Sequence, residues 1–254
     1  MKKIVFLGSK NVGYNALSYL IQNSQILNIE IVGVLSNNRT LYSDKKNVHD
    51  LALTNNIPFL SHPDELLGID NFDFLISVQY HKIIKQKHID TAKELAINLH
   101  MAPLPEYRGC NQFSFAIIDQ IKEFGTTLHV LDSGIDSGDI LFESRFNMDV
   151  NETVVSLYEK TLEKSILLFE ENISKILVGD YSRTPQKQLY SQRSSNFHLR
   201  NEIHDIKQID PKWSDEKIDR YVRATYFPPF PPPYFVKNGK KIELSLDWRN
   251  QIKS

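Results

Sequence analysis

The sequence predicts an α/β protein in which a mostly parallel sheet has helices on both faces and a small C-terminal region ends in a β-hairpin. Two observations predict this fold. Short β-type runs alternate with helical patterns along the first half of the chain, as they do in βαβ units. Near the end, an Asn-Gly pair precedes a stretch in which every second residue is apolar. We therefore expect a Rossmann-like sheet followed by a hairpin.

The composition is that of an ordinary globular protein, with 254 residues, 41% of them hydrophobic, and a formal net charge of −1. Because the net charge is near zero, no strong field draws the chain to nucleic acid, and we expect no nucleic-acid partner. The single cysteine, Cys110, suits a reducing compartment, so we expect a cytoplasmic protein. The first apolar run is too short for a signal peptide, and none reaches the roughly 20 residues of a membrane helix. We expect no membrane association.

The first βαβ unit is predicted at the N-terminus. Residues 4–7 and 29–35 are apolar runs of strand type, and residues 12–22 between them have a helical pattern. Later strands are predicted where apolar runs are bounded by Gly, Asp, Asn or Pro, at residues 72–78, 95–99, 126–131 and 140–146.

A long helix is predicted after these strands. Apolar residues recur at spacings of three and four from Val155 to Ile176, which gives one largely apolar face. Asn151 is a candidate N-terminal cap and Gly179 a candidate C-terminal cap. The polar, serine-rich stretch 181–196 follows and is typical of a linker. We therefore expect a catalytic domain at residues 1–185 and a small region at residues 186–254.

The small region contains three local signals. Ser214 and the acidic residues after it start a helix. Five prolines enforce an extended loop at residues 227–234, and Asn238-Gly239 is a hairpin turn with an alternating strand at 242–248. The aromatic side chains of the loop are either hairpin core or a platform for a base, namely Phe227, Phe230 and Tyr234.

Charge is divided unevenly along the chain. Residues 186–254 carry 13 basic and 8 acidic side chains, whereas acidic residues predominate before them. This mild excess either favours a phosphate-bearing ligand or is only a solvated surface.

The loop Gly8–Gly13 follows the first strand and opens the first helix, where backbone N–H groups could bind a phosphate. It lacks the third glycine of a dinucleotide fingerprint and the Gly-Lys-Ser/Thr ending of a P-loop. Neither a nicotinamide cofactor nor ATP is indicated. A purely structural turn is the alternative.

Asn98 and His100 lie two residues apart at the end of a predicted strand, so both side chains point to one face. Ligands of open α/β sheets bind at the carboxyl ends of the strands. An amide donor beside an imidazole base can stabilise an oxyanion and accept a proton. The alternative is a histidine that is only hydrogen-bonded in the core.

A turn between two predicted strands carries three carboxylates, those of Asp132, Asp136 and Asp139. Its spacing does not fit the calcium-binding loop of an EF-hand, which requires a glutamate at position twelve. We expect no metal here, and a plain turn is the alternative.

Together these residues resemble the formyltransferases that use 10-formyltetrahydrofolate. That family has a catalytic Asn-x-His on one strand and a catalytic Asp in a turn of the type Asp-x-Gly-x-Asp-x-Gly, and both patterns occur here. The resemblance spans roughly residues 1–180 and implies Asn98, His100 and Asp136 as the catalytic trio. In that scheme His100 accepts the proton of an amine, Asn98 donates to the oxyanion, Asp136 orients His100, and no metal is needed.

The loop after the strand departs from the family in one respect. The commoner His-Pro-Ser-Leu-Leu-Pro is His100-Met-Ala-Pro-Leu-Pro105 here, so a loop hydroxyl is missing. The resemblance further implies contacts with the folate formyl donor from Met101, Pro103, Leu104, Asp132 and Ile135.

The Met-Ala loop, the segment Tyr107-Arg-Gly-Cys-Asn111 and the Pro-rich tail look like the branch that formylates nucleotide-linked amino sugars. This implies a dTDP-linked amino sugar as substrate, with dTDP-4-amino-4,6-dideoxyglucose fitting best, for O-antigen or other surface glycan synthesis. It also implies a homodimer through the C-terminal region. We expect Ser9 and Lys10 near the pyrophosphate, and sugar or base contacts from Tyr80, Tyr107, Arg108 and Asn111.

Three alternatives remain at this point. Arg108 could form an ion pair with Glu106 instead of contacting a substrate. A methionyl-tRNA formyltransferase shares the first domain but adds a sizeable basic RNA-binding domain, whereas only about 60 residues follow the linker here. A nucleotide-sugar binding module without catalysis is the third, and the presence of the whole trio argues against it.

Overall fold

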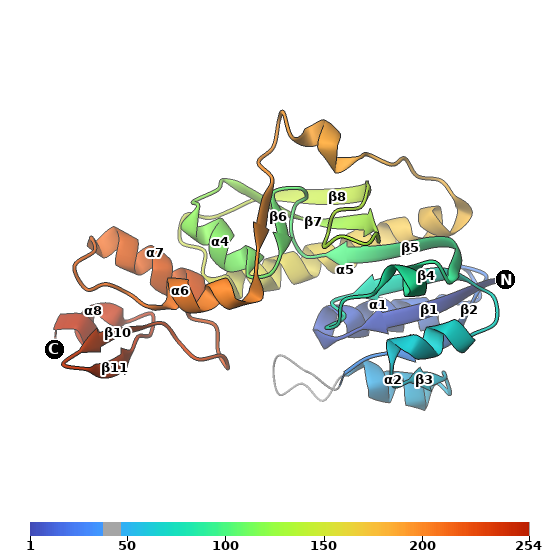
Figure 1. Ribbon diagram of the computed structural model, residues 1–254, viewed down its shortest axis with the longest axis horizontal. Coiled ribbons are helices and arrows are strands. Elements are labelled where there is room, and N and C mark those ends of the chain that lie inside the picture. The colour runs from blue at the N-terminus through green and yellow to red at the C-terminus, as the bar shows by residue number, and fades with distance from the viewer. Residues whose placement is uncertain (38–46, 254) are drawn as a thin grey trace.

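The computed structural model describes residues 1–37 and 47–253 and contains a seven-stranded sheet (Figure 1). The strand order is β3-β2-β1-β4-β5-β7-β8, in which the first five strands are parallel and β7 and β8 are antiparallel to their neighbours. The expected mostly parallel sheet is therefore confirmed. The strands are β1 Lys2–Gly8, β2 Ile29–Leu35, β3 Phe59–Leu60, β4 Phe72–Val78, β5 Ala92–His100, β7 Glu123–Val130 and β8 Ile140–Asn147.

Helices cover both faces of this sheet, as expected. On one face, α1, α2, α4 and α5 contribute to the main apolar core. On the other face, the short 3₁₀ helix η1 and α3 bury a smaller cluster against β1 and β4. The helices are α1 Lys10–Gln22, α2 Val48–Thr54, η1 Pro63–Gly68, α3 Gln86–Ile89, α4 Gln112–Ile118 and α5 Val154–Val178.

The long helix α5 forms where the apolar periodicity places it, but the expected cap is wrong. Thr153, and not Asn151, is the N-cap, because its Oγ1 accepts the backbone N–H of Ser156 at 3.1 Å. The C-terminal prediction is confirmed, since Gly179 has a φ of +81°, a conformation that favours glycine. α5 packs along the sheet behind β7 (Figure 1).

The C-terminal region folds around its own small core of Ile209, Ile218, Val222, Phe235, Leu244 and Trp248. Ser214 caps α7 as predicted, and Asn238-Gly239 forms the hairpin turn. The predicted strand at 242–248 is wrong beyond Glu243: Trp248 begins a helix, and its indole N–H donates to Asp219 on α7 at 3.2 Å. The elements are α6 Ile203–Lys207, α7 Asp215–Thr225, β10 Tyr234–Lys237, β11 Lys240–Glu243 and α8 Trp248–Lys253.

The Pro-rich loop joins the small core to the large one. Phe227 packs against Tyr158 of α5, with ring centroids 5.5 Å apart, so its ring belongs to the main core. Phe230 is half exposed and lies on Phe227. Within the described residues, no helix combines the length and the apolar character needed to cross a bilayer.

The serine-rich stretch that looks like a linker lies against the sheet. It contains the 3₁₀ helix η2 Gln186–Leu189 and the strand β9 Asn196–His198, which pairs with β6 Tyr107–Gly109 (Figure 1). A further 3₁₀ turn, η3 Arg200–Glu202, leads into α6. The division of the chain at residue 185 stays a prediction.

Candidate active site

Strand β5 delivers Asn98 and His100 to one face of the sheet, as its period of two requires. Ile97 and Leu99, the two neighbours of Asn98 in the chain, point the other way, into the main core under α5. The carboxyl ends of β1 and β4 lie at the same edge of the sheet, because these strands run parallel to β5. The two polar side chains therefore lie where α/β sheets bind their ligands.

Two threonines of β7 fix the backbone at the end of β5. Thr126 Oγ1 donates to the carbonyl of His100 at 3.0 Å, and Thr127 Oγ1 donates to the carbonyl of Ala102 at 2.8 Å. Both hydroxyls are completely buried. The chain thus leaves the sheet in a defined direction and without unpaired carbonyls at these positions.

His100 is held with a defined tautomer. Its Nε2 lies 2.7 Å from the carbonyl oxygen of Tyr107, and because a carbonyl can only accept, Nε2 carries the proton. In the neutral ring the basic nitrogen is then Nδ1, which lies 3.6 Å from Oδ2 of Asp136. This distance is longer than a hydrogen bond and corresponds to an ion pair that forms when His100 is protonated.

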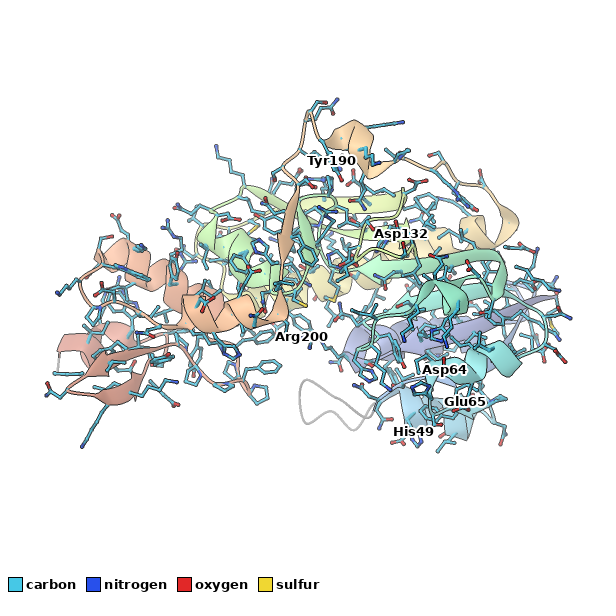
Figure 2. All side chains as sticks on the ribbon, in the orientation of Figure 1. His49, Asp64, Glu65, Asp132, Tyr190 and Arg200 are labelled. Atoms are coloured by element: carbon cyan, nitrogen blue, oxygen red, sulfur yellow. The ribbon has the colours of Figure 1, made fainter. Side chains whose placement is uncertain are left out.

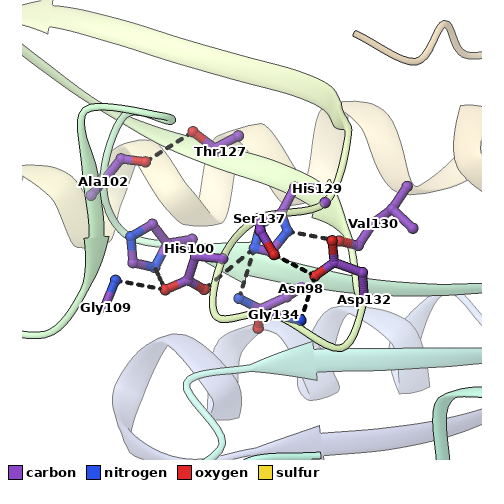
Figure 3. Close-up of polar contacts among 12 residues, drawn as sticks. Asn98, His100, Ala102, Gly109, Thr127, His129, Val130, Asp132, Gly134 and Ser137 are labelled. Atoms are coloured by element: carbon purple, nitrogen blue, oxygen red, sulfur yellow. Dashed lines mark hydrogen bonds and ion pairs between the residues drawn. The ribbon is translucent and has the colours of Figure 1, made fainter. Parts of the chain in front are cut away.

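His129 is a part of the site that sequence reasoning missed. It stands opposite Asn98 in the β5–β7 ladder, and Asn98 Nδ2 lies 3.1 Å from its Nε2 (Figure 3). His129 Nδ1 lies 2.8 Å from the carbonyl of Val130, so Nδ1 carries the proton and Nε2 accepts the amide N–H. His129 therefore determines which way the Asn98 amide faces. Knowing that the predicted strands 95–99 and 126–131 pair would have placed His129 beside Asn98. That pairing is set by the tertiary structure and not by a local pattern.

Asp136 lies between the two histidines. One of its oxygens is 3.6 Å from His100 Nδ1 and the other is 3.6 Å from His129 Nε2. Oδ2 also accepts the backbone N–H of Gly109 at 2.9 Å. Burial opposes ionisation of this carboxyl, but His100, His129 and the Gly109 N–H outweigh it and hold the pKa of Asp136 well below its usual range. The structure thus brings Asn98, His100 and the ionised carboxylate of Asp136 together at one site.

Asp132, predicted as a folate contact, stabilises the turn that carries Asp136. Its Oδ1 accepts the backbone N–H of Gly134 at 3.1 Å and the hydroxyl of Ser137 at 2.7 Å (Figure 3). The side chain of Ile135 at the tip of the same turn is 41% exposed. It offers an apolar surface next to the trio.

The other residues predicted to contact folate are inside the protein. Met101 and Leu104 are completely buried, and Pro103 is buried as well. Met101 and Leu104 therefore present no surface to a ligand in this structure. Their role in folate binding stays a prediction.

The residues predicted near the pyrophosphate lie at the start of α1. Ser9 is buried and its hydroxyl donates to Asn37 Oδ1 at 2.8 Å. Lys10 Nζ donates to Oε1 of Gln79, which follows β4, at 3.0 Å. Tyr80, predicted near the sugar or base, follows β4 and is half buried against the smaller apolar cluster, and burial raises the pKa of its hydroxyl. These side chains border the same sheet edge as the trio.

The residues predicted near the sugar or base are mainly tied to other protein groups. The ring of Tyr107 is buried, its hydroxyl donates to Asp119 at 2.9 Å, and it presents only its carbonyl to the site. Asn111 Nδ2 donates to the carbonyl of Leu199 at 2.8 Å. Arg108 donates to the hydroxyl of Ser195 at 3.2 Å.

The alternative ion pair of Arg108 with Glu106 is not formed. Glu106 is paired instead with Arg145, at 2.8 Å. That pair lines a cavity of about 640 Å³. Arg193 also lines this cavity, whereas Asn98, His100 and Asp136 do not. Among the residues that the structure describes, no three His, Cys, Asp or Glu side chains converge on a metal-binding point.

Comparison with known proteins assigns this fold and site to a family. The formyl transferase family matches residues 2–172, which contain β1 to β8 and most of α5. The chain is a member of the formyl transferase family. The match includes the strand with Asn98 and His100 and the turn with Asp136.

Two relatives of this chain carry the names of different formyltransferases and match it over different lengths. A GDP-perosamine N-formyltransferase of Brucella melitensis is 34% identical over 168 residues, which are 66% of this chain and 62% of that protein. The chain thus matches less than two thirds of the length of that relative. A methionyl-tRNA formyltransferase of Lactobacillus gasseri is 27% identical over 258 residues, covering 96% of this chain and 78% of its own length.

A solved structure extends the likeness to the C-terminal region. An N-formyltransferase from Helicobacter canadensis, crystallised with folinic acid and dTDP-3-aminofucose, superposes with a TM-score of 0.77 at 26% identity. The alignment covers 95% of this chain and 86% of the other. The likeness of fold therefore extends beyond the family match and includes most of the C-terminal region.

Substitution of Gly109 is expected to displace Asp136. Gly109 has a φ of +87°, and a Cβ there would lie 2.4 Å from the carbonyl oxygen of His198. Gly109→Ala must move β6 away from β9, and with it the N–H that holds Asp136. We expect kcat to fall about 100-fold, the scale of a 1 Å misplacement in an active site.

Gly179→Ala is the matched control for backbone strain. Gly179 has a nearly equal φ of +81°, but no atom lies within 4 Å of a Cβ there. Formyl transfer in Gly179→Ala is expected to match that of the wild type, although some stability is lost. Equal activity in the two variants would show that the hydrogen bond from Gly109 to Asp136 does not matter for turnover.

The depressed pKa of Asp136 predicts a pH dependence of stability. Because the folded-state pKa lies below the ordinary value of 3.8, the ionised carboxylate stabilises the fold at pH values above about 3.8. This contribution is lost as the pH falls further, through the folded-state pKa. Asp136→Asn should therefore be less stable than the wild type at pH 7, and the difference should shrink below about pH 3.8.

Urea unfolding at a series of pH values measures this difference. Asp180→Asn, at an exposed position, controls for the loss of one negative charge. A stability difference between wild type and Asp136→Asn that does not change with pH would contradict the lowered pKa of Asp136 in the folded protein.

Proposed function

We propose that this protein is an N-formyltransferase that moves the formyl group of 10-formyltetrahydrofolate to the amine of a nucleotide-linked amino sugar. The observation that carries the proposal is the convergence of Asn98, His100 and Asp136 at the carboxyl end of β5. Membership of the formyl transferase family supports the chemistry. The names of the Brucella and Helicobacter relatives support an amino-sugar acceptor.

The proton of the attacking amine has one clear destination. As the nitrogen attacks the formyl carbon, it becomes cationic and must lose a proton. His100 can take it only at Nδ1, because its Nε2–H is already donated to the Tyr107 carbonyl. The imidazolium that results is held between that carbonyl and Asp136. It can give the proton to the folate nitrogen when the oxyanion collapses and the bond between that nitrogen and the formyl carbon breaks, so that tetrahydrofolate leaves. General-base assistance of this kind contributes typically ~10²- to 10⁴-fold in rate.

Asn98 would stabilise the negative oxygen that develops on the formyl group. Its Nδ2 carries two hydrogens, and His129 Nε2 accepts one of them. The other can be donated to the oxyanion without any rotation of the side chain. Loss of such a donor costs roughly 2.7–4 kcal/mol in comparable sites.

Asp136 supplies the negative charge that the proton transfer needs. It is ionised, partly buried and adjacent to the nitrogen that takes up the proton, so it stabilises the imidazolium as it forms. The ionised carboxylate also repels negative charge, which favours placing the oxyanion on the Asn98 side of the site.

The surroundings of the trio fit a large, partly apolar formyl donor. Ile135 is exposed beside Asp136, and Tyr80 is half buried against the apolar cluster of the same face. When bound, the folate supplies the formyl group that the residues of this chain position and activate. We propose Ile135 and Tyr80 as the side chains that border it.

For the acceptor we propose a dTDP-linked amino sugar, with dTDP-4-amino-4,6-dideoxyglucose as the first candidate, used in O-antigen or other surface glycan synthesis. The dTDP-3-aminofucose in the name of the Helicobacter structure supports a thymidine nucleotide. Lys10 at the start of α1 is the cation we place near the pyrophosphate. A cytoplasmic location is part of this proposal.

Methionyl-tRNA formylation is the second candidate. It is favoured by the Lactobacillus relative, whose match extends over 96% of this chain. The C-terminal region argues against it, because its 13 basic and 8 acidic side chains are a weak attraction for an RNA backbone.

An assay of acceptors tests the proposal. Purified protein is mixed with 10-formyltetrahydrofolate and, separately, with dTDP-4-amino-4,6-dideoxyglucose, a dTDP-3-amino sugar, GDP-perosamine and methionyl-tRNA. Release of tetrahydrofolate is followed by absorbance. We expect turnover with a nucleotide-linked amino sugar. Formylation of methionyl-tRNA alone would replace the proposal by the second candidate.

His100→Ala and Asn98→Ala are each expected to lower kcat by at least ~100-fold, because each removes one base or one oxyanion donor. Circular dichroism should show that both variants remain folded. Turnover near that of the wild type in either variant would exclude the residue from the mechanism.

We also propose that the C-terminal region forms a homodimer contact. This region exposes apolar side chains that its own core does not cover, including Val236 of β10 at 48% and Leu246, between β11 and α8, at 49%. Light scattering at micromolar concentration is expected to give the mass of a dimer, and Val236→Glu the mass of a monomer. A monomer mass for the wild type would reject this interface.

A further inference from the structure

The segment 184–198, which we call the strap, lies across the catalytic face although its sequence is typical of a linker. Its first end is bonded to β8, where the backbone N–H groups of Thr184 and Ile140 each donate to the other's carbonyl at 2.9 Å. Its last end is β9, which pairs with β6. Figure 2 places Tyr190 at the outer edge of the strap and Arg200, just beyond it, near the middle of the molecule. The formyl transferase family match ends at residue 172, before the strap.

Gln186 is the strap residue that reaches the catalytic turn. It is only 3% exposed, and its Nε2 lies 2.8 Å from the carbonyl oxygen of Asp136 and 2.8 Å from that of Gly138. Both partners can only accept, so the amide must face the turn with its nitrogen. One side chain thus donates hydrogen bonds to two backbone carbonyls in the second half of the turn.

The turn needs support at these positions because its backbone is constrained there. Asp136 has a φ of +51°, a left-handed conformation that residues other than glycine rarely adopt. Gly138 lies so close to β7 that a Cβ would be 1.9 Å from the carbonyl oxygen of Val130. The first half of the turn is fixed by Asp132, whereas the carbonyls of its second half are bonded to Gln186.

The strap also holds the other side of the site. Arg193 donates to the carbonyl of Leu104 at 3.1 Å and forms a two-pronged ion pair with Glu143 on β8. β9 aligns β6, which provides the Tyr107 carbonyl for His100 and the Gly109 N–H for Asp136. The strap therefore holds both the carbonyl that binds His100 and the N–H that binds Asp136.

We propose that Gln186 is a positioning residue for catalysis, which holds the carboxylate of Asp136 at its distance from His100 and His129. The inference rests on the proposed function, since it assigns a role within that site. Gln186 is buried against the turn: it acts on the backbone of Asp136, and through it on the imidazolium formed during transfer.

Gln186→Met tests the proposal, because methionine keeps the length and most of the volume and removes both donors. We expect kcat to fall about 10- to 100-fold, with little change in the KM of either substrate, since the change displaces a catalytic group and not a binding surface. Gln188→Met is the matched control: Gln188 lies in the same 3₁₀ helix and is exposed. It should behave as the wild type.

A second readout reports the position of Asp136 directly. The backbone N–H of Gly109 donates to Asp136, so its hydrogen exchange follows that contact. We expect faster exchange at Gly109 in Gln186→Met and unchanged exchange at amides of α5. A kcat equal to that of the wild type, or slower turnover explained entirely by a lower melting temperature, would overturn the proposal.

Gln186→Asn covers the case in which the methionine variant does not fold. It keeps the amide but withdraws it by one methylene, so the same loss of kcat and the same faster exchange at Gly109 are expected. A folded Gln186→Asn with the kcat of the wild type would overturn the proposal. If the wild type formylates none of the amino sugars, the proposed function fails, while exchange at Gly109 still decides whether Gln186 holds Asp136.

Discussion

One ionised carboxylate, that of Asp136, organises the candidate active site of this protein. Its two oxygens face His100 and His129, and a backbone N–H from Gly109 completes the contacts. A largely buried carboxylate is costly unless charges and donors compensate for the lost water, and here they lower its pKa in spite of burial. His100 is one of these compensating groups and is also the base of the proposed chemistry, so stability and the proposed catalysis share this contact.

The mixed sheet makes these contacts possible. Five parallel strands bring the carboxyl ends of β1, β4 and β5 to one edge, where phosphate and folate could approach. The antiparallel strand β7 then places His129 directly opposite Asn98 and continues into the turn with Asp136. Its threonines bind the carbonyls of His100, the last residue of β5, and of Ala102 just beyond it, so the end of the strand that carries Asn98 and His100 is fixed. The strap covers this arrangement from outside and connects it to the C-terminal region.

Much of the fold could be predicted because it depends on local periodicity. The strands at 29–35 and 72–78 and the face of α5 follow from residues that are near one another in the chain. Where packing between distant elements decides, the predictions were wrong or incomplete. Trp248 continues an alternating pattern, yet it starts a helix, with its side chain buried in the small core and its indole N–H donated to Asp219 on α7. Tyr107 has the sequence context of a ligand contact, yet its ring is core and only its carbonyl faces the site.

The sequence by itself determined the alternation of strands and helices, the hairpin turn, and the shared face of Asn98 and His100, since these follow from backbone periods of 3.6 and 2 residues. It also indicated the family through two short motifs. Only the tertiary structure decided that His129 orients the Asn98 amide and that Gln186 holds the turn of Asp136. Partners 31 and 50 positions apart in the chain meet through strand order and the return of the strap. No local pattern encodes such a meeting, because it depends on how the whole core packs.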